Sequence, residues 1–445
     1  MSHSVLASLA VAFAATLVAG TALASEPDAP AEAPLTFVFG NPRLGMEGGV
    51  RTFDSLGRLV VYTTSAVPAG VFQDETTPHG KALGVFGRIG KLVLFDEPVA
   101  EFEGTAIHEV FGHGSRAREF HMSASYTFTL PGVYCFLFSP ECGSRGHTQR
   151  AAFAKTVDNE IAIVAGGVEA NYLTAHWVNA RIAETAGRVR YDDALLYSLS
   201  KMQYAGSFFG LKSASTATSG SNDIENYALL LADRQNRLRS TDRDRIAMRL
   251  TLASLWNLAD PMLWASIYGL LVRYVAVGER TWQLPLPRVL GATVFAVPRF
   301  NLAPFGAEHY VDVFMHHSRM TANVYARVGS SGNGSYAGAG ARVFRFKLGE
   351  RVYGGTELDV WKQPELLFEE RAVYNRRELW GWNVATTAEW RFHERVGMFG
   401  RFGYKTRGHL MGQPLAEGVH GYFGLTLSLE RGAAAARDAS DMRNR

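Results

Sequence analysis

Apolar residues recur at two different periods along the chain, and the change of period divides it into two parts. Between about Pro98 and Val277 the apolar positions fall mainly three and four residues apart, which predicts helices with a buried face. From about Val289 onward apolar and polar positions alternate, which predicts β-strands. We therefore expect an α+β protein with a mainly helical N-terminal domain over 35–287 and an antiparallel β domain over 288–430.

The alternation is clearest in one segment of the β domain. Its outward set of positions is mostly apolar and aromatic: Trp380, Trp382, Val384, Thr386, Ala388, Trp390 and Phe392. Tryptophans near both ends of a strand of this length are typical of membrane-spanning strands with two interfacial aromatic girdles. Similar runs occur at Val289–Val297, Glu308–His316, Ala322–Val328, Ser335–Phe346, Val352–Val360, Val396–Thr406 and Val419–Leu429. The sequence thus contains eight candidate strands.

Eight strands are enough to close a small barrel, so the β domain is predicted to be an antiparallel β-barrel of about eight strands. Tyr422, Gly424, Leu427 and Leu429 resemble the C-terminal recognition signal of bacterial outer-membrane barrel proteins, although a polar tail over 431–445 follows them here. The resemblance implies insertion in the outer membrane. The alternative is a soluble antiparallel sheet or sandwich with one face on the helical domain.

The N-terminal segment has the pattern of an export signal. Residues 1–24 contain an apolar run and end in small residues, which predicts a secretory signal peptide cleaved after Ala24. A transmembrane anchor is the alternative, but the run is shorter than the ~20 residues that a spanning helix needs. Residues 25–34 have the composition of a flexible linker. Export would place Cys135 and Cys142 in an oxidising compartment, where they form a disulfide or remain free thiols.

The candidate chemistry lies within Thr105–Ser115. This segment contains His108, Glu109, Gly112 and His113, an H-E-x-x-H zinc-binding pattern with one additional residue. Histidines five residues apart lie about 140° apart around a regular helix, which is too far for them to share a metal ion. A π-type bulge, which Gly112 is placed to allow, would bring them together, and such bulges concentrate at functional sites.

The pattern H-E-x-x-G-H resembles the variant zinc motif of the dipeptidyl peptidase III family, within the gluzincin class of metallopeptidases. The resemblance implies that His108 and His113 bind Zn²⁺, that Glu109 is the general base, and that the third ligand is a glutamate on a later helix. By analogy with zinc peptidases, an edge strand beside the motif helix would pair with an extended peptide substrate. The sequence predicts strands at Leu35–Phe39, Arg58–Thr63 and Leu83–Phe95. The last of these, which precedes a helix expected over about Pro98–Glu119, is the candidate.

A long helix predicted over about Gln149–Ala186 offers the third ligand. Glu169 is preferred, because Gly166 and Gly167 let another helix approach closely and because a buried carboxylate needs a partner. An ion pair between Glu169 and a base such as Arg181 is the interpretation without a metal. Two other side chains could serve as the third ligand: Glu160 and His121.

Together these features predict a zinc-dependent peptidase of the bacterial cell envelope. Its catalytic domain would face the periplasm or the lumen of an outer-membrane barrel, and its substrates would be peptides or proteins. The formal net charge of +3 and the dispersed basic residues give no sign of a nucleic-acid partner. The alternatives are an outer-membrane structural or transport barrel with a non-catalytic metal site, and a zinc hydrolase of a non-peptide substrate.

Overall fold

The structure is a computed structural model of the 445-residue chain. It describes residues 33–40, 45–64, 77–129, 134, 146–150, 156–209, 223–234, 240–318, 320–331, 334–367 and 377–429. The predicted signal peptide, the polar tail and both cysteines lie outside the described residues, as does most of the predicted linker.

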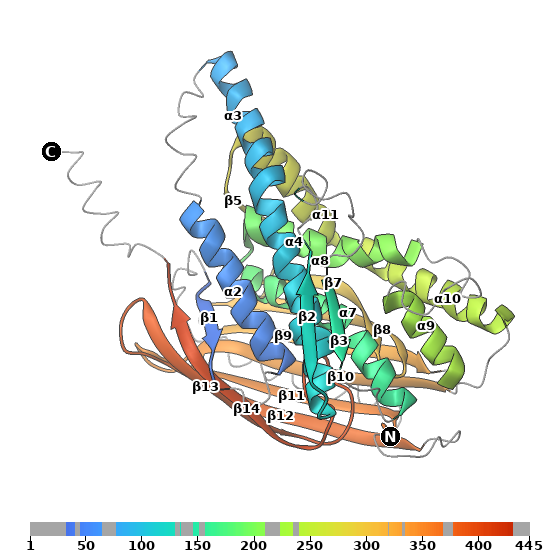
Figure 1. The fold of residues 1–445 in the computed structure, drawn as a ribbon. Coiled ribbons are helices and arrows are strands. Elements are labelled where there is room, and N and C mark those ends of the chain that lie inside the picture. Colours follow the sequence, from blue (N-terminus) through green and yellow to red (C-terminus); the bar gives the residue numbers. More distant parts are fainter. Residues whose placement is uncertain are drawn as a thin grey trace.

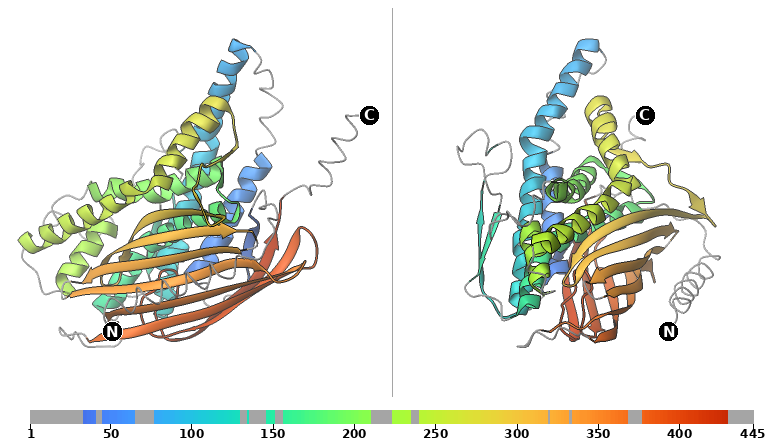
Figure 2. Two further views of the ribbon diagram at one scale, coloured as in Figure 1. Left: turned by 180° about the vertical axis from the view of Figure 1, so that it is seen from behind. Right: turned by 90° about the vertical axis from the view of Figure 1, so that its right-hand side faces the viewer.

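The helices lie on the concave side of a large curved sheet (Figures 1 and 2). The helical elements are α2 (Met46–Thr64), α3 (Pro78–Lys91), η2 (Leu92–Asp96), α4 (Glu97–Ala106), η3 (Ile107–His113), α5 (Gly114–Glu119), α7 (Val157–Glu184), α8 (Tyr191–Phe209), α9 (Asp223–Arg234), α10 (Ser240–Ser254), η4 (Leu255–Ala259), α11 (Pro261–Tyr268) and η5 (Gly269–Val277). Among the helices in the described residues, none has the length and apolarity needed to cross a membrane.

One helical path runs without interruption from α3 through η2, α4 and η3 to α5. It contains the helix predicted over Pro98–Glu119, but its first part replaces the strand predicted over Leu83–Phe95. That prediction is wrong because Leu83, Phe86 and Ile89 are spaced three residues apart, which places them on one face of a helix. All three side chains are exposed in the structure, so this helical face does not pack against the core.

The strand predicted over Arg58–Thr63 is also wrong, because this segment is the end of α2. The buried residues Val50, Asp54, Arg58 and Val61 follow one another at four- and three-residue intervals along this helix. A local run of β-branched and aromatic residues suggested a strand, but packing of a helical face determined the outcome. The strand predicted over Leu35–Phe39 is confirmed as β1 (Leu35–Val38).

Ten strands form a single antiparallel sheet in the order β1-β14-β13-β12-β11-β10-β9-β8-β7-β6. After β1, its strands are β6 (Arg288–Val289), β7 (Ala292–Ala303), β8 (Gly306–His317), β9 (Met320–Ser331), β10 (Gly334–Lys347), β11 (Val352–Pro364), β12 (Glu378–Arg391), β13 (Val396–Lys405) and β14 (Gly418–Leu427). The eight predicted strands correspond to β7 through β14, so the mixed α+β class and the antiparallel C-terminal sheet are confirmed.

The sheet is not closed into the predicted barrel. Its edges are β1 and β6, and within the described residues no strand pairing joins them. A closed barrel of about eight strands has an interior just wide enough for its own side chains. Here α7 packs against β7, β8 and β9 on the concave side, so the sheet has to remain open to accommodate helices.

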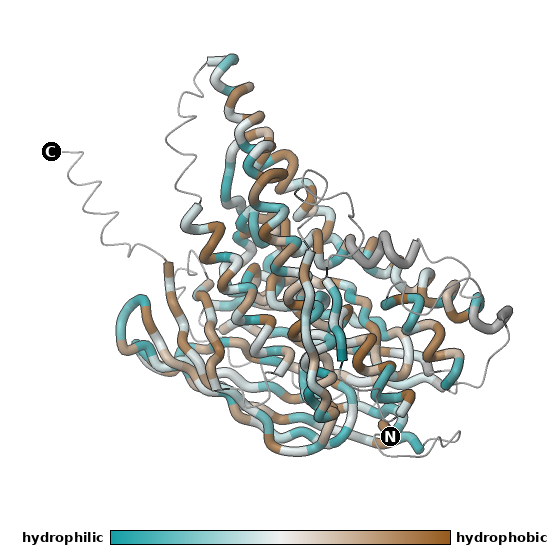
Figure 3. Tube along the Cα trace, in the orientation of Figure 1, coloured by the Kyte–Doolittle hydropathy of each residue, from teal (hydrophilic) through white to brown (hydrophobic). Residues whose placement is uncertain are grey.

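Strand β12 buries its polar side chains and exposes most of its apolar ones. In β12 the side chains of Trp380, Trp382 and Trp390 are 47%, 44% and 52% exposed, whereas Asn383 and Glu389 on the opposite face are 0% and 9% exposed. Figure 3 shows the same alternation of hydrophobic and hydrophilic positions along the strands. The polar face of β12 therefore lies toward the helices and its apolar face is at the outer surface, whereas β7 and β8 also bury apolar side chains such as Phe300 and Phe314 in the clusters shared with the helices.

Helix α7 is the central element of the helical layer. Thr156 caps its first turn by accepting a hydrogen bond from the backbone N–H of Asn159. Its buried residues include Val168 and Tyr172, which belong to an apolar cluster shared with α2, η3 and α9. Two small sheets complete the fold: β2 (Ala124–Phe128) pairs with β3 (Gly146–Arg150), and β4 (Arg188–Arg190) pairs with β5 (Thr281–Gln283).

Candidate metal centre

The two motif histidines lie in a π-helical turn, as their spacing predicts. The turn is η3, which spans Ile107–His113 and interrupts the α-helical path between α4 and α5. It places the Nε2 atoms of His108 and His113 3.1 Å apart, with the two rings nearly perpendicular at 89°. The predicted bulge is therefore confirmed, and it brings both histidines to one point.

Three glycines allow η3 and α7 to cross at this point. A Cβ atom on Gly112 would lie 2.5 Å from the Cα of Gly167 and 2.7 Å from the carbonyl oxygen of Gly166. A Cβ atom on Gly167 would lie 2.4 Å from Cε1 of His108 and 2.7 Å from Nε2 of His113. The close helix approach that the Gly166-Gly167 pair predicts is thus present, and the space it leaves is occupied by the two imidazoles.

The third member of the cluster is Asp223, at the first position of α9. Its Oδ2 atom lies 2.8 Å from Nε2 of His108 and 3.1 Å from Nε2 of His113. Ligand atoms of a tetrahedral zinc ion with bonds of about 2.0–2.1 Å lie about 3.3 Å apart. The three atoms are therefore close to the arrangement that a single small metal ion would impose, and the cluster could hold a metal ion.

The surroundings of the cluster fix its protonation pattern. Nδ1 of His113 lies 2.7 Å from the carbonyl oxygen of Ile163, which leaves Nε2 as the atom directed at the cluster. Burial alone would lower the pKa of His113, but the Asp223 carboxylate outweighs it and raises the pKa to about 9. Burial would raise the pKa of Asp223, but the two histidines hold it well below its usual range. The site is thus arranged around a carboxylate that keeps its negative charge.

Glu109, the predicted general base, is buried beside the cluster. Its Oε2 atom accepts a short hydrogen bond from the hydroxyl group of Thr148 on β3, and its backbone carbonyl oxygen lies 3.3 Å from the same hydroxyl. A Cβ atom on Gly146 would lie 2.8 Å from Cγ of Glu109, so β3 passes directly along this side chain. The strand beside the motif helix is therefore β3.

Glu169, the predicted third ligand, lies elsewhere. Its two carboxylate oxygens accept hydrogen bonds from the guanidinium group of Arg116, at 2.5 and 3.2 Å, and one of them also accepts from the backbone N–H of Gly412 at 2.8 Å. Burial would raise the pKa of Glu169, but Arg116 and His409 keep it below its usual range. The ion pair with a base, which the sequence leaves open, is what the structure shows.

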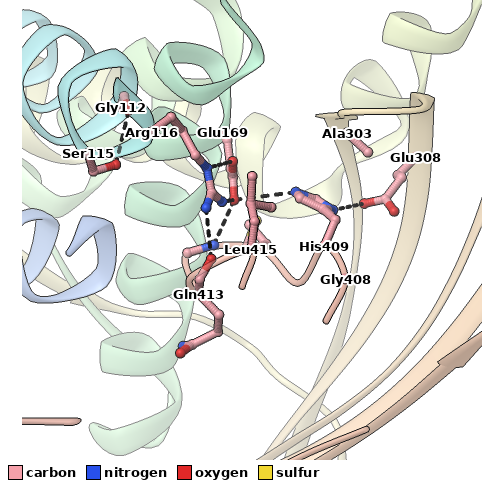
Figure 4. A network of polar contacts seen from close by, with 12 residues as sticks. Gly112, Ser115, Arg116, Glu169, Ala303, Glu308, Gly408, His409, Gln413 and Leu415 are labelled. Carbon is pink, nitrogen blue, oxygen red and sulfur yellow. Dashed lines mark hydrogen bonds and ion pairs between the residues drawn. The ribbon is translucent and has the colours of Figure 1, made fainter. Parts of the chain in front are cut away.

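This ion pair belongs to a chain of charges that joins the motif helix to the sheet (Figure 4). The imidazole of His409 lies between Glu169, at 3.4 Å, and Glu308 on β8, at 3.7 Å. Glu308 in turn pairs with Arg327 on β9 at 2.8 Å. Glu169 therefore holds α7 and α5 against the sheet and against the segment between β13 and β14, which contains His409 and Gly412.

The other two candidates for the third ligand are also remote from the cluster. Glu160 pairs with Arg150 at 2.6 Å. His121 is an exposed residue in the turn after α5, with a positive φ of 58°. Among the described residues the third member of the cluster is therefore Asp223, and Glu169, Glu160 and His121 lie outside it.

Two functional residues are absent from the sequence-based set. Asp223 directly follows a Ser- and Thr-rich segment and opens a helix, where an acidic residue is ordinarily interpreted as favouring the helix N-terminus. Thr148 lies in a segment for which the sequence predicts no strand. The distance of Asp223 and Thr148 from the motif along the chain gives no sign that they lie beside it, because tertiary packing brings both residues there.

Comparison with known proteins adds no identity to this site: no family model, no curated protein and no solved structure matches the chain.

Proposed function

We propose that the protein is a zinc-dependent hydrolase that cleaves peptide bonds, with His108, His113 and Asp223 as metal ligands and Glu109 as general base. The observation that carries the proposal is the convergence of three ligand atoms within 2.8–3.1 Å on a π-helical turn that also carries a buried glutamate. Two imidazoles and one carboxylate form a three-ligand set of the kind that catalytic zinc sites use, with a further position left for substrate or water.

The chain's own residues account for the proton transfers. Zinc held by this ligand set supplies Lewis acidity, which acidifies water and polarises a carbonyl group. Glu109 accepts a proton from the attacking water and donates it to the amine that leaves. The hydroxyl group of Thr148 holds one oxygen of Glu109, so the other is left to receive the proton. Ile163 orients His113 through its backbone carbonyl oxygen.

A peptide is the substrate that β3 favours. In the described residues β3 pairs only with β2, so one edge of β3 has no strand partner. An extended peptide that adds to such an edge is held by main-chain hydrogen bonds whatever its sequence. Since β3 also contacts Glu109, a peptide on this edge would lie next to the general base.

The sheet supports a location in the outer membrane of the cell envelope. Its strands β7 to β12 are 12–14 residues long. This exceeds the roughly 9–11 residues that a tilted membrane-spanning strand needs. The exposed tryptophans Trp380 and Trp390 lie near opposite ends of β12, where membrane strands carry aromatic girdles. Lipid contact with the apolar outer face of these strands would remove that face from water.

The catalytic role is tested with Glu109→Gln, and Glu279→Gln is the matched control because Glu279 pairs with Arg273 of η5 and belongs neither to the cluster nor to β3. The substrates are an unfolded protein and a fluorogenic peptide library. We expect E109Q to keep about one zinc per chain and to lose hydrolysis by roughly 10²–10⁴-fold, the usual contribution of a general base. Retained hydrolysis in E109Q would show that the mechanism is wrong.

Two other outcomes would select the alternatives. Zinc binding without hydrolysis of any peptide, but with hydrolysis of an ester or amide that is not a peptide, would move the proposal to a non-peptide substrate. Zinc binding without any hydrolysis would leave a structural or transport protein whose metal holds α7, α9 and η3 together.

The membrane location is tested by placing a charge on the outer face. Val384 lies at the middle of β12 and is 45% exposed, whereas Leu348, in the turn after β10, is 61% exposed. In lipid, Val384→Lys should cost about 2–4 kcal/mol of folding free energy, because a charge at mid-depth has to leave water. Leu348→Lys should have little effect. Equal and small effects of the two substitutions would indicate that this face is in water.

A further inference from the structure

We propose that a second site, a cavity between α2, α7 and the polar face of the sheet, binds a small oxyanion such as phosphate through arginine side chains. The cavity is separate from the metal centre. Gly167, at the metal centre, and Ala180, at the cavity, are 13 residues apart on α7, which corresponds to roughly 20 Å along the helix axis.

Basic side chains outnumber acidic ones around this cavity. Six arginines line it: Arg51, Arg58, Arg181, Arg342, Arg345 and Arg401. Five carboxylates line it: Glu47, Asp54, Glu184, Glu357 and Glu389. We refer to it as the arginine cavity. With all groups ionised the lining alone carries one excess positive charge, since six minus five is one; just outside it, Asp193 pairs with Arg181 and Arg391 pairs with Glu389, and these two further charges cancel each other.

The carboxylates are concentrated on three of the arginines. Glu357 pairs with Arg342 at 2.6 Å and with Arg401 at 2.8 Å, and Asp54 pairs with Arg181 at 2.6 Å. The remaining arginines have weaker or neutral contacts. The positive charge of the lining is therefore unevenly neutralised, and the surplus lies on the other three.

Two guanidinium groups present donors that no hydrogen bond satisfies. Nε of Arg345 lies 3.4 Å from a carboxylate oxygen of Glu389, which is an ion pair without hydrogen-bond geometry, and its buried Nε and Nη2 atoms make no hydrogen bond. These two atoms form the edge of the guanidinium group that binds an oxyanion with two parallel hydrogen bonds. Nε of Arg58 is also buried without a partner, and Arg58 is only 5% exposed. A buried donor left without a partner costs about 1–3 kcal/mol, which a bound anion would recover.

Arg51 supplies a third cationic group with neutral partners. Its guanidinium group lies 3.1 Å from the hydroxyl of Tyr422 and 3.4 Å from that of Thr36, and it stacks over the Trp177 ring at 4.5 Å from the centroid. These contacts fix its plane and leave its charge without a bound carboxylate. Arg51, Arg58 and Arg345 therefore approach the cavity from α2 and from β10.

The electrostatics of the neighbouring groups agree with a missing negative charge. Burial lowers the pKa of Arg58 and the nearby guanidinium group of Arg181 lowers it further, and the carboxylates of Asp193 and Asp54 only partly offset this. Burial also raises the pKa of Glu184, which reduces its negative charge relative to that of a solvated glutamate. An anion in the cavity would stabilise the charged form of Arg58.

The cavity has room for such a ligand. Its volume is about 100 Å³. A single water molecule needs about 10–15 Å³ on the same measure, so the space suits several waters or one small oxyanion. A metal cation is a poor candidate for the ligand. The groups that lack partners are guanidinium N–H donors, and these have no lone pair with which to bind a cation.

The test is phosphate binding to the full-length chain, measured by calorimetry and by the rise in melting temperature, with chloride at equal ionic strength as the screening control. We expect Arg345→Gln to weaken phosphate binding at least tenfold. Arg351→Gln is the matched control, because Arg351 is an exposed residue in the neighbouring turn and its substitution changes the net charge equally. Should R345Q not fold, Arg51→Gln tests the same cavity from the helical side.

Each experiment is repeated in the metal-ligand variant Asp223→Ala, so that phosphate bound to zinc is not counted. A parallel titration with glycerol 3-phosphate distinguishes a free phosphate from a phosphomonoester headgroup, and a response to either supports the proposal. No stabilisation by phosphate beyond that of chloride, or equal stabilisation of wild type and R345Q, would show that the arginine cavity holds water only.

Discussion

The metal centre and the arginine cavity lie along the same helix, α7, and would bind ligands of opposite charge. At the metal centre two imidazoles and a carboxylate converge at 2.8–3.1 Å, an arrangement that a cation would stabilise. In the arginine cavity Nε of Arg58 and the Nε and Nη2 atoms of Arg345 lie buried without hydrogen bonds, an arrangement that an anion would stabilise. Each cluster would be stabilised by an added ion: a cation at the metal centre and an anion in the arginine cavity.

The two clusters differ in how the chain builds them. The metal centre forms where two helices cross without side chains between them, at Gly112 and Gly167, so it is small and its geometry is set by backbone contact. The arginine cavity forms where helices meet the sheet, and long side chains from both layers fill the space. We expect the first site to be intolerant of a single added methyl group and the second to depend on individual charges.

The largest expected effect separates the two sites at Asp223. Replacing Asp223 with Ala removes one of three ligands, and zinc binding should weaken by more than the roughly 10–100-fold that loss of an outer-shell partner costs. Phosphate binding should be unchanged, because Asp223 is not part of the arginine cavity. Zinc competition with a chelating dye and phosphate calorimetry on the same preparation measure both quantities.

Glu169→Gln is the control for this experiment, because the sequence alone assigns the third ligand to Glu169. The structure predicts that E169Q keeps zinc and loses up to about 3 kcal/mol of folding free energy, since the buried Arg116 loses one of its two carboxylate partners and keeps only Glu119. Zinc loss in E169Q together with retained zinc in D223A would reverse the assignment.

The next effect in size concerns the helix crossing. Gly167→Ala would place a Cβ atom 2.4 Å from the His108 ring, so the imidazole or the helix has to move. We expect zinc binding at least tenfold weaker and a loss of about 1–3 kcal/mol of stability, as for other overpacked cores. Gly104→Ala is the control: its Cβ atom would meet only Nδ2 of Asn171, at 3.9 Å, and alanine favours a helix by about 0.5–1 kcal/mol. Equal zinc affinity in the two variants would contradict the role of the crossing.

The contrast between the sites also determines what could be predicted from sequence. His108, Glu109 and His113 are neighbours in the chain, so their spacing predicts both a shared metal ion and the π-helical turn that sharing requires. Asp223 could not be found in this way, because its position depends on how α9 packs against α7 across a long separation in sequence. The arginine cavity is even harder to predict from the sequence, since its lining residues are spread along the chain from Pro34 to Thr426.

The fold shows the same division between local and non-local information. The eight long strands β7 to β14 were predictable, because each carries its own two-residue alternation. The open form of the sheet was not, because it depends on the helices that occupy the concave side. The strand predicted over Leu83–Phe95 failed on a local ambiguity, in which Gly residues between apolar ones obscured a three-residue period.

The smallest effect we predict concerns the hydrogen bond between Thr148 and Glu109, and it tests whether β3 belongs to the metal centre. Thr148→Val removes the hydroxyl group while keeping the shape of the side chain. A hydrogen bond to a charged group contributes about 1.5–3 kcal/mol, so kcat should fall at least roughly tenfold while zinc content and phosphate binding stay unchanged. Thr148→Ser restores the hydroxyl group and should restore kcat. If the role of Thr148 is purely structural, Thr148→Val lowers the melting temperature and leaves kcat normal. If Thr148 positions Glu109, Thr148→Val lowers kcat and Thr148→Ser restores it.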